Sequence, residues 1–457
     1  MAFTRLRADE LVNVWAADRH TPMQIALLGV FDAGPFRRAD GAVDTAGIRA
    51  ALAARARRVP ALGRRVVWTR LGEGRPIWVA DPWFDPLRHV GAVTLPPGAA
   101  PGSWAAGRAL RPLRRDRPLW RAEVVEGLPG GRFAVLIVVS HVLADGRTGV
   151  ALAGALLDPA ADTGLEEPAA AAVPPLPTHR ELLRVRLHDG VAALRRARPD
   201  ATGRRRGRQG LEQLRDLLSD LGAPVPRTSL PRRTGPGRRL AVARHPLADL
   251  QRAGHALHVT VNDLLLAAVA GGLRQLFAAR GEQLPGLVVR ASVPAATGLP
   301  GQQVMGMLVV DLPVGEPDPL RRLALICHAT TAGKARLRAG VGSVVDIRLP
   351  APVARLVVRW GRRFGSRSIS LSVTDLAGPS VPLWLAGARL VEAVPIAPLV
   401  LQVPLAVAAL SYAGELVVTV NADAAITDVD VLAGGIAQAF TDLTGLTGAA
   451  ARCRPSS

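Results

Sequence analysis

Apolar residues along the first third of the chain recur with two different spacings. Helical spacing predicts helices at residues 8–17, 45–57 and 102–110. Short apolar runs rich in β-branched residues predict strands at residues 25–31, 65–68, 77–79, 122–126 and 133–139. Helices and strands that alternate in this way are typical of a mixed α/β domain.

A second alternating segment begins near residue 239. Its pattern predicts a strand at 240–244, helices at 247–256, 260–279 and 321–337, strands at 288–293, 305–312 and on through Val420, and a closing helix at 429–446. Between the two segments, residues 158–177 are rich in Ala and Pro and predict a loop, while residues 179–221 are helical in pattern and highly charged. We therefore divide the chain into an N-terminal domain at 1–178, a helical, Arg-rich crossover at 179–238, and a C-terminal domain at 239–457.

The strand predicted at residues 133–139 stops abruptly at polar residues. His141 follows its end, Asp145 comes four residues later, and Gly146 opens an Ala- and Leu-rich stretch that predicts a helix. A fully buried strand has no room for an imidazole, so we expect His141 at the mouth of the strand. A neutral imidazole there is suited to general-base catalysis at neutral pH, although the same position also suits a histidine that only caps the strand.

The pattern His141-x-x-x-Asp145-Gly146 after a strand resembles the active-site motif of the chloramphenicol-acetyltransferase-like superfamily. Other short segments, in the same order along the chain, resemble the motifs of bacterial wax ester synthase/diacylglycerol acyltransferases. These segments are Thr21-Pro22-Met23-Gln24, Pro118-Leu119-Trp120, Thr228-Ser229-Leu230 with Arg238-Arg239, Thr260-Val261-Asn262-Asp263, Val293-Pro294, Gly378-Pro379, Leu385-Ala386-Gly387-Ala388-Arg389, and Ser411-Tyr412 with Gly414. Ordered agreement is more specific than any single motif, and the chain is identified as a divergent member of this family.

The resemblance implies a fold of two similar chloramphenicol-acetyltransferase-like α/β domains, with the active site in a tunnel between them. It implies an O-acyltransferase that moves a long-chain acyl group from acyl-CoA to a lipid hydroxyl, making triacylglycerol from diacylglycerol or a wax ester from a fatty alcohol. His141 would take the proton from the acceptor hydroxyl, and Asp145 would hold the loop by pairing with an arginine. Acyl-CoA is a substrate in this scheme, and no cofactor, metal or covalent acyl-enzyme is expected.

Other residues of these motifs have both a chemical and a structural interpretation. Asn262 is a candidate donor to the oxyanion, as are backbone amides near Gly146. The pattern Thr260-x-x-Asp263 also fits a helix capping box, which accounts for Asp263 by itself. In the segment Pro118-Leu119-Trp120, the first two residues shape a turn and the tryptophan fits a wall of the core or of the tunnel.

Several polar positions depart from the family pattern. Ser140 stands where the family usually has the first of two histidines, so His141 keeps the position of the base and Ser140 is expected to support its loop. Further differences lie at Pro231, Ala295-Ala296, Gly301-Gln302 and Thr374-Asp375-Leu376-Ala377. Two alternatives therefore stay open: an acyltransferase that uses another acceptor, such as a polyketide or an amine, and a catalytically silent homologue that binds lipid or coats lipid bodies.

The positive charge of the chain raises the question of a nucleic-acid partner. The formal net charge is +20, and the basic residues cluster in the crossover, for example at Arg204, Arg205, Arg206 and Arg208. Aromatic residues are not interleaved with these arginines, and no nucleic-acid-binding motif accompanies them, so nucleic acid is not expected as a partner. The cluster is interpreted either as a solvated linker or as a site of attraction to an anionic membrane surface.

The remaining composition favours a cytoplasmic protein, either free or peripheral to the inner face of the membrane. Two distant cysteines, Cys327 and Cys453, give no disulfide framework and no metal-ligand spacing. Charges interrupt the apolar residues of the N-terminus, which does not fit a signal peptide. The most apolar stretch, residues 393–410, contains three prolines and predicts buried strands and turns instead of a spanning helix.

Overall fold

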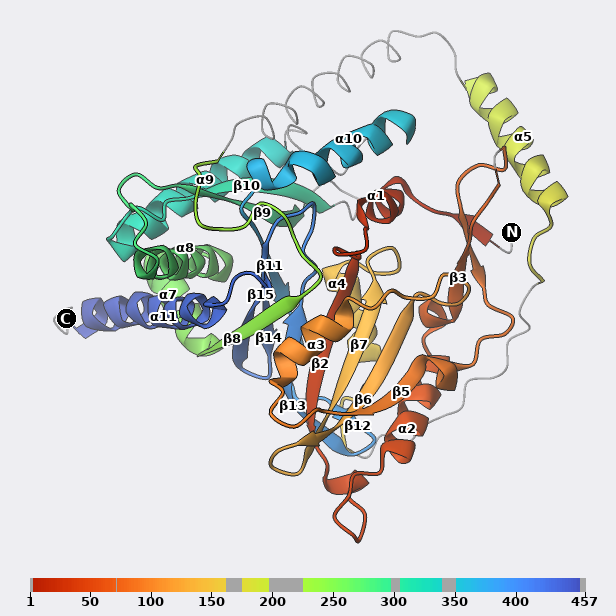
Figure 1. Ribbon diagram of the computed structural model, residues 1–457, viewed down its shortest axis with the longest axis horizontal. Helices are drawn as coiled ribbons and strands as arrows, with labels where there is room; N and C mark the ends of the chain where they lie inside the picture. Colours follow the sequence, from red (N-terminus) through yellow and green to blue (C-terminus); the bar gives the residue numbers. More distant parts are fainter. Residues whose placement is uncertain are drawn as a thin grey trace.

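The computed structural model describes residues 3–70, 72–161, 175–196, 225–296, 305–338 and 351–452. Within these residues the chain forms two six-stranded sheets and one three-stranded sheet, with helices packed on them (Figure 1). The fold is mixed α/β, as the alternation of elements predicts. Most of the predicted loop at 158–177 and the arginine cluster at 204–208 lie outside the described residues.

The first sheet carries the segment that ends at His141. Its strand order is β12 (Trp384–Leu385), β13 (Ala388–Ile396), β2 (Gln24–Asp32), β7 (Arg132–Ser140), β6 (Trp120–Leu128) and β5 (Val90–Thr94). Strand β7 is central and pairs antiparallel with both β2 and β6.

Helices cover both faces of β7, which explains its continuous apolar sequence. Phe133, Val135, Ile137 and Val139 point to the face covered by α2 (Thr45–Arg57) and α4 (Gly146–Ala155). The alternate residues Ala134, Leu136 and Val138 point to the face covered by α3 (Pro101–Ala109).

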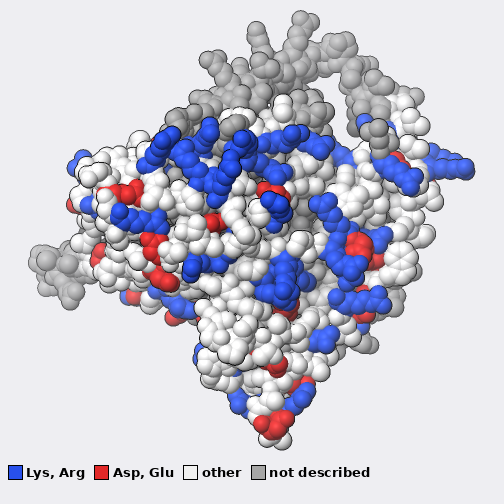
Figure 2. All heavy atoms as spheres, in the orientation of Figure 1, with Lys and Arg blue, Asp and Glu red and all other residues white. Residues whose placement is uncertain are grey.

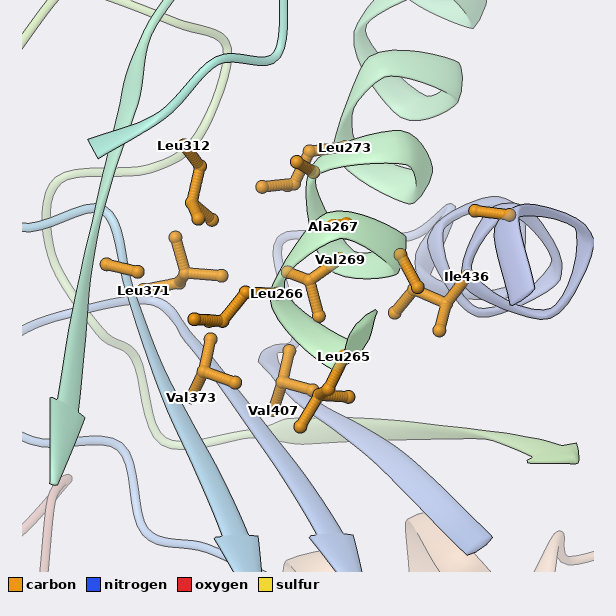
Figure 3. Packing of buried hydrophobic residues seen from close by; sticks show 14 of the residues in the cluster. Leu265, Leu266, Ala267, Val269, Leu273, Leu312, Leu371, Val373, Val407 and Ile436 are labelled. Atoms are coloured by element: carbon orange, nitrogen blue, oxygen red, sulfur yellow. The ribbon is translucent and has the colours of Figure 1, made fainter. Parts of the chain in front are cut away.

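The second sheet has the order β10 (Met305–Leu312), β9 (Val289–Ala296), β11 (Leu371–Ala377), β14 (Leu405–Tyr412), β15 (Glu415–Asp423) and β8 (Arg238–Pro246). Its main core lies against α8 (Val261–Ala279), whose side chains meet β11, β14 and α11 (Val429–Arg452), as Figure 3 shows. A Cβ on Gly272 would lie 2.7 Å from the Leu432 main-chain oxygen, so glycine allows the close approach of α8 and α11. Of the helices in the described ranges, α8 alone has the length and hydropathy of a membrane span, and most of it is buried inside the protein.

The second half of the chain contributes two strands to the first sheet. Strands β12 and β13 come from the second half of the sequence, yet β13 pairs with β2 in the first sheet. Ser103 of α3 also exchanges hydrogen bonds with the main chain of Leu240 in β8. The sequence division at residue 239 therefore does not separate the two sheets, because residues 384–396 complete the first one.

Some elements are absent from the sequence-based prediction. The structure adds β1 (Phe3–Arg5) and β5, and it places α10 (Ala351–Phe364) where only strands were expected. Helix α10 buries Ala354, Val358 and Gly361 and exposes arginines, so its sequence is strongly amphipathic and carries a helical pattern that the prediction missed. The remaining elements are α1 (Ala8–Ala16), β3 (Arg64–Val67), β4 (Ile77–Ala80), α5 (His179–Arg196), α7 (Leu247–Leu257), α9 (Pro319–Arg338) and the short 3-10 helices Gly34–Phe36, Pro60–Gly63, Pro86–His89 and Gly365–Arg367.

Candidate active site

His141 is the first residue after β7, and neighbouring segments fix its main chain. The His141 amide donates to the Met23 carbonyl at 2.8 Å, and the Ser140 amide donates to the Leu119 carbonyl at 3.0 Å. The motif is thus anchored between the start of β2 and the segment Pro118-Leu119-Trp120. Sequence reasoning expected the histidine at the mouth of the strand, and the structure places it there.

Ser140 organises the turn that follows. Its hydroxyl accepts a hydrogen bond from the Val142 amide at 3.3 Å. Its carbonyl accepts from the amides of Leu143 and Ala144 at 2.9 and 3.1 Å. A serine side chain that bonds to the backbone two residues on is a common way to stabilise a turn, and these contacts fit the supporting role expected of Ser140.

Asp145 is the N-cap of α4. Its Oδ1 accepts a hydrogen bond from the Thr148 amide at 2.7 Å, and its charge lies at the positive end of the helix dipole. An arginine partner was expected, but within the described ranges no ion pair of Asp145 is formed. Arg7 is the nearby cation: its pKa is raised mainly by a hydrogen bond with Asp9, and also by the charges of Glu10, Asp9 and Asp145. Asp145 therefore holds the loop through the backbone of α4.

Gly146 brings this loop against the second sheet. A Cβ at this position would lie 3.0 Å from Cδ2 of Leu376 in β11, so a side chain there would displace the leucine. His141 consequently belongs to a loop that meets the second sheet at β11. The next residue back along β11 is Asp375. This residue reaches solvent, and partial burial of its carboxyl group raises the pKa of that group.

The environment of His141 favours a neutral imidazole. Burial lowers the pKa of the imidazole, while a hydrogen bond with its own main-chain carbonyl and the charges of Asp145 and Asp9 act in the opposite direction. The residue nevertheless keeps an intermediate solvent exposure.

Asn13 is a contact of His141 that sequence reasoning missed. Its Nδ2 lies 3.2 Å from the His141 main-chain oxygen and 3.3 Å from Nδ1 of the imidazole. The two residues are 128 positions apart, so local patterns carry no signal for the contact. The one available hint was a polar residue between Val12 and Val14 on a helix with apolar neighbours.

The segment Pro118-Leu119-Trp120 shapes the base of the site. The Trp120 indole is buried, donates to the Leu62 carbonyl at 2.8 Å and stacks on His89 at a centroid distance of 4.7 Å. The Pro118 carbonyl accepts from the Trp120 amide, and Leu119 packs in a cluster with Val142. Trp120 is therefore a core residue of the first sheet, which fits the structural interpretation.

Asn262 and Asp263 begin α8. Thr260 and Asp263 form the expected capping box, and Asp263 also accepts from the Thr330 hydroxyl at 2.8 Å, so its carboxylate has a structural use. Asn262 is half-buried and lies one turn before Leu266, which packs against β11 near Val373 (Figure 3). No hydrogen bond joins Asn262 to the His141 loop within the described residues, and its role toward an oxyanion stays a prediction.

Among the described residues, no group of three or more His, Cys, Asp or Glu side chains could hold a metal ion. That the reaction needs no metal also stays a prediction.

Comparisons with known proteins agree with this arrangement. The chain matches the family models for the wax ester synthase/diacylglycerol acyltransferase catalytic domain at residues 7–265 and for the C-terminal domain of the same family at residues 303–444. It is 29% identical over 452 residues to a "Probable diacyglycerol O-acyltransferase tgs1" of Mycobacterium tuberculosis (strain CDC 1551 / Oshkosh), covering 94% of this chain and 93% of that protein.

Two solved structures share the fold. The wax ester synthase/diacylglycerol acyltransferase from Marinobacter aquaeolei VT8 matches with a TM-score of 0.68 at 20% identity and covers 97% of this chain and 100% of that one. The first condensation domain of the CDA synthetase matches with a TM-score of 0.58 at 19% identity and covers 96% of each chain. These matches extend over both sheets.

Proposed function

Because the chain belongs to the wax ester synthase/diacylglycerol acyltransferase family, we propose that it moves a long-chain acyl group from acyl-CoA to a lipid hydroxyl, with His141 as the general base. The acceptor we propose is diacylglycerol, a fatty alcohol, or both. The observation that carries this proposal is the His141 imidazole, which burial keeps neutral on a loop between the first sheet and β11. The tunnel for the two substrates would lie where the His141 loop meets β11.

The reaction needs few groups. The acceptor hydroxyl gives its proton to the imidazole as its oxygen forms a bond to the thioester carbonyl carbon. The resulting oxyanion needs preorganised hydrogen-bond donors, for which Asn262 and the backbone amides at the start of α4 are the candidates. Collapse of the intermediate breaks the carbon–sulfur bond, and the coenzyme A thiolate takes the proton back from His141. The proton taken from the acceptor hydroxyl leaves with the coenzyme A thiol, so these steps need no group beyond the two substrates and the protein.

An acceptor panel tests the proposal. Purified protein and labelled palmitoyl-CoA should give triacylglycerol with diacylglycerol, or a wax ester with a fatty alcohol. Product only with an amine or a polyketide acceptor would favour the alternative acyltransferase. Binding of acyl-CoA without turnover on any acceptor would favour the silent homologue, for which Ser140→His is the informative variant because it restores the first histidine of the family pattern.

A basic face on α10 supports approach of the enzyme to an anionic lipid surface. Ala354 and Val358 are buried on the inner side, and Val358 packs with residues of α1. The opposite side exposes Arg355, Arg359 and the 66%-exposed Leu356. Figure 2 shows arginine and lysine side chains gathered across this part of the surface. Cations flanking an exposed apolar side chain on an amphipathic helix are suited to the interface of a membrane that contains anionic lipid.

Neutralising this face should weaken membrane binding. The double variant Arg355→Gln/Arg359→Gln should pellet less with vesicles containing phosphatidylserine at low salt, since each basic residue near such a surface contributes about 1 kcal/mol. The difference should fade as salt rises. A matched control is Arg57→Gln/Arg58→Gln, which removes two exposed arginines at the end of α2, far from α10 in Figure 1. Equal pelleting of both variants and wild type would show that α10 does not contact the membrane. A loss of pelleting confined to variants of Arg204, Arg205, Arg206 and Arg208 would place the membrane contact in the crossover.

A further inference from the structure

We infer that Asn13 is a positioning residue for the reaction, which holds the His141 carbonyl and through it the orientation of the imidazole. This inference rests on the proposed role of His141 as the general base. Asn13 comes from α1, and no motif of the sequence includes it.

Helix α1 is a fixed platform for this contact. Its first turn is closed by a hydrogen bond from the Arg7 amide to Glu10 Oε2 at 2.7 Å, and Glu10 is in turn bonded by the Trp78 indole at 3.3 Å. Leu11 is buried in the cluster that contains Val142 of the His141 loop. Because both faces of the turn around Asn13 are packed, its amide has little freedom to move away from His141.

A bond of the imidazole to its own main chain assigns one of its two neutral forms, and this assignment decides which contact of Asn13 is a hydrogen bond. The ring forms a hydrogen bond with its own main-chain carbonyl, and Nδ1 is the donor because Nε2, on the far side of the ring, cannot reach the carbonyl of its own residue. In this form Nδ1 carries the proton, and the lone pair of Nε2 is free to accept a proton from substrate. The 3.3 Å approach of Asn13 Nδ2 to Nδ1 is then a contact between two donors, and the hydrogen bond of Asn13 is the one to the His141 carbonyl at 3.2 Å.

The carbonyl of His141 is therefore shared by two donors, the Asn13 amide and the imidazole itself. The Asn13 bond fixes the direction of the carbonyl, and the carbonyl fixes the rotation of the ring about its side-chain bonds. Without Asn13 the ring would still be present and neutral, but Nε2 would point at the substrate for a smaller fraction of the time. Such a loss lowers the rate of proton transfer and leaves substrate binding largely unchanged.

The variant Asn13→Leu removes the donor while keeping the size of the side chain. We expect kcat to fall about tenfold, the amount that one net hydrogen bond is worth, while KM for acyl-CoA stays within about twofold of wild type because binding contacts are untouched. In a His141→Ala background the same change should have no further effect, since there is no imidazole left to orient.

The variant Asn13→Asp gives a readout that a structural role would not move. A carboxylate at this position would accept from Nδ1–H and stabilise the imidazolium, which raises the pKa of His141. Because the base must be neutral, the rising acidic limb of the kcat/KM profile should move to higher pH. If Asn13→Leu does not fold, the pH profile of Asn13→Asp still tests whether Asn13 positions the imidazole. Asn421→Ala is the matched control, because Asn421 also donates its side-chain amide to a backbone carbonyl, that of Ala397 at 2.8 Å, and its loss should leave the pH profile unchanged.

The outcomes separate this inference from the proposed function. If His141→Ala abolishes turnover but Asn13→Leu keeps wild-type kcat and Asn13→Asp keeps the wild-type pH profile, Asn13 is not a positioning residue. A rise in kcat for Asn13→Leu would also overturn the inference, because it would mean that the amide donates to Nδ1 and holds the unproductive form. If His141→Ala itself keeps turnover, it is the proposed function that fails.

Discussion

Replacement of His141 by alanine should lower acyl transfer by about 10²- to 10⁴-fold, the usual cost of losing a general base. Ser140 occupies the position of the first histidine of the family pattern, so no neighbouring imidazole can take over the proton. Folding should be retained, because His141 is only half-buried and its main-chain bond to Met23 does not depend on the side chain. Steady-state turnover, measured beside acyl-CoA binding and thermal unfolding, checks the prediction.

Ser140→His is the matched control at the adjacent position. Ser140 is half-buried at the end of β7, and its hydroxyl bond to the Val142 amide is a long one at 3.3 Å. We expect this variant to fold and to keep wild-type turnover. Wild-type turnover in His141→Ala would contradict the mechanism. The silent homologue would instead be supported if the wild-type protein binds acyl-CoA without turnover and the Ser140→His variant does turn it over.

The local part of the site could be predicted from the sequence, because it depends on residues that are close in the chain. The apolar run before His141 predicts β7, and the spacing of Thr260 and Asp263 predicts the capping box that the structure shows. Asp145 lies in the predicted loop, but within the described residues its carboxylate has a different contact from the expected one. Its carboxylate caps α4, a contact three residues away, whereas the expectation of an arginine came from the family resemblance and not from this chain.

Contacts between distant segments could not be predicted, because hydrophobic periodicity records which face of an element is buried but not what buries it. The alternation at residues 388–396 predicts a strand, yet nothing in it indicates that β13 joins β2 instead of the second sheet. The bond from Asn13 to His141 is of the same kind, since α1 reaches the loop through tertiary packing with Trp78, Leu119 and Val142. The contacts that position His141 thus come from Asn13, Met23 and Leu119, which are distant in the sequence but all lie in the first half of the chain.

A buried ion pair secures β12 and β13 against the first half of the chain. Arg55 of α2 donates from Nε to both carboxylate oxygens of Asp158, at 3.2 and 3.1 Å, and from Nη2 to Oδ2. The two side chains are only 2% and 5% exposed. The main chain of Asp158 exchanges hydrogen bonds with Trp384 of β12 at 2.7 and 2.9 Å, and its Oδ2 accepts from the Ala386 amide at 3.3 Å. One aspartate therefore connects α2 to the strands that arrive from the second half.

Asp158→Ala should consequently be among the most destabilising single changes in the first sheet. It leaves the Arg55 guanidinium buried without its partner, and breaking a buried pair from one side costs about 3–5 kcal/mol. Equilibrium urea unfolding followed by tryptophan fluorescence measures the loss, with Asp116→Ala as the control. Asp116 pairs with Arg114 at 2.6 Å, but both side chains are more than half exposed, so solvent screens the pair and little change is expected.

The double variant Arg55→Met/Asp158→Leu separates the penalty of an unpaired charge from the value of the pair itself. Replacing both partners with apolar side chains removes the buried charge, and such replacements are often neutral or stabilising. We expect it to recover most of the stability that Asp158→Ala loses, although the Ala386 amide then lacks its acceptor. If Asp158→Ala loses no more than the exposed control, the pair does not secure β12 against α2. If the double variant is as unstable as the single one, the backbone contacts of Asp158, and not the charge of Arg55, hold the two halves together.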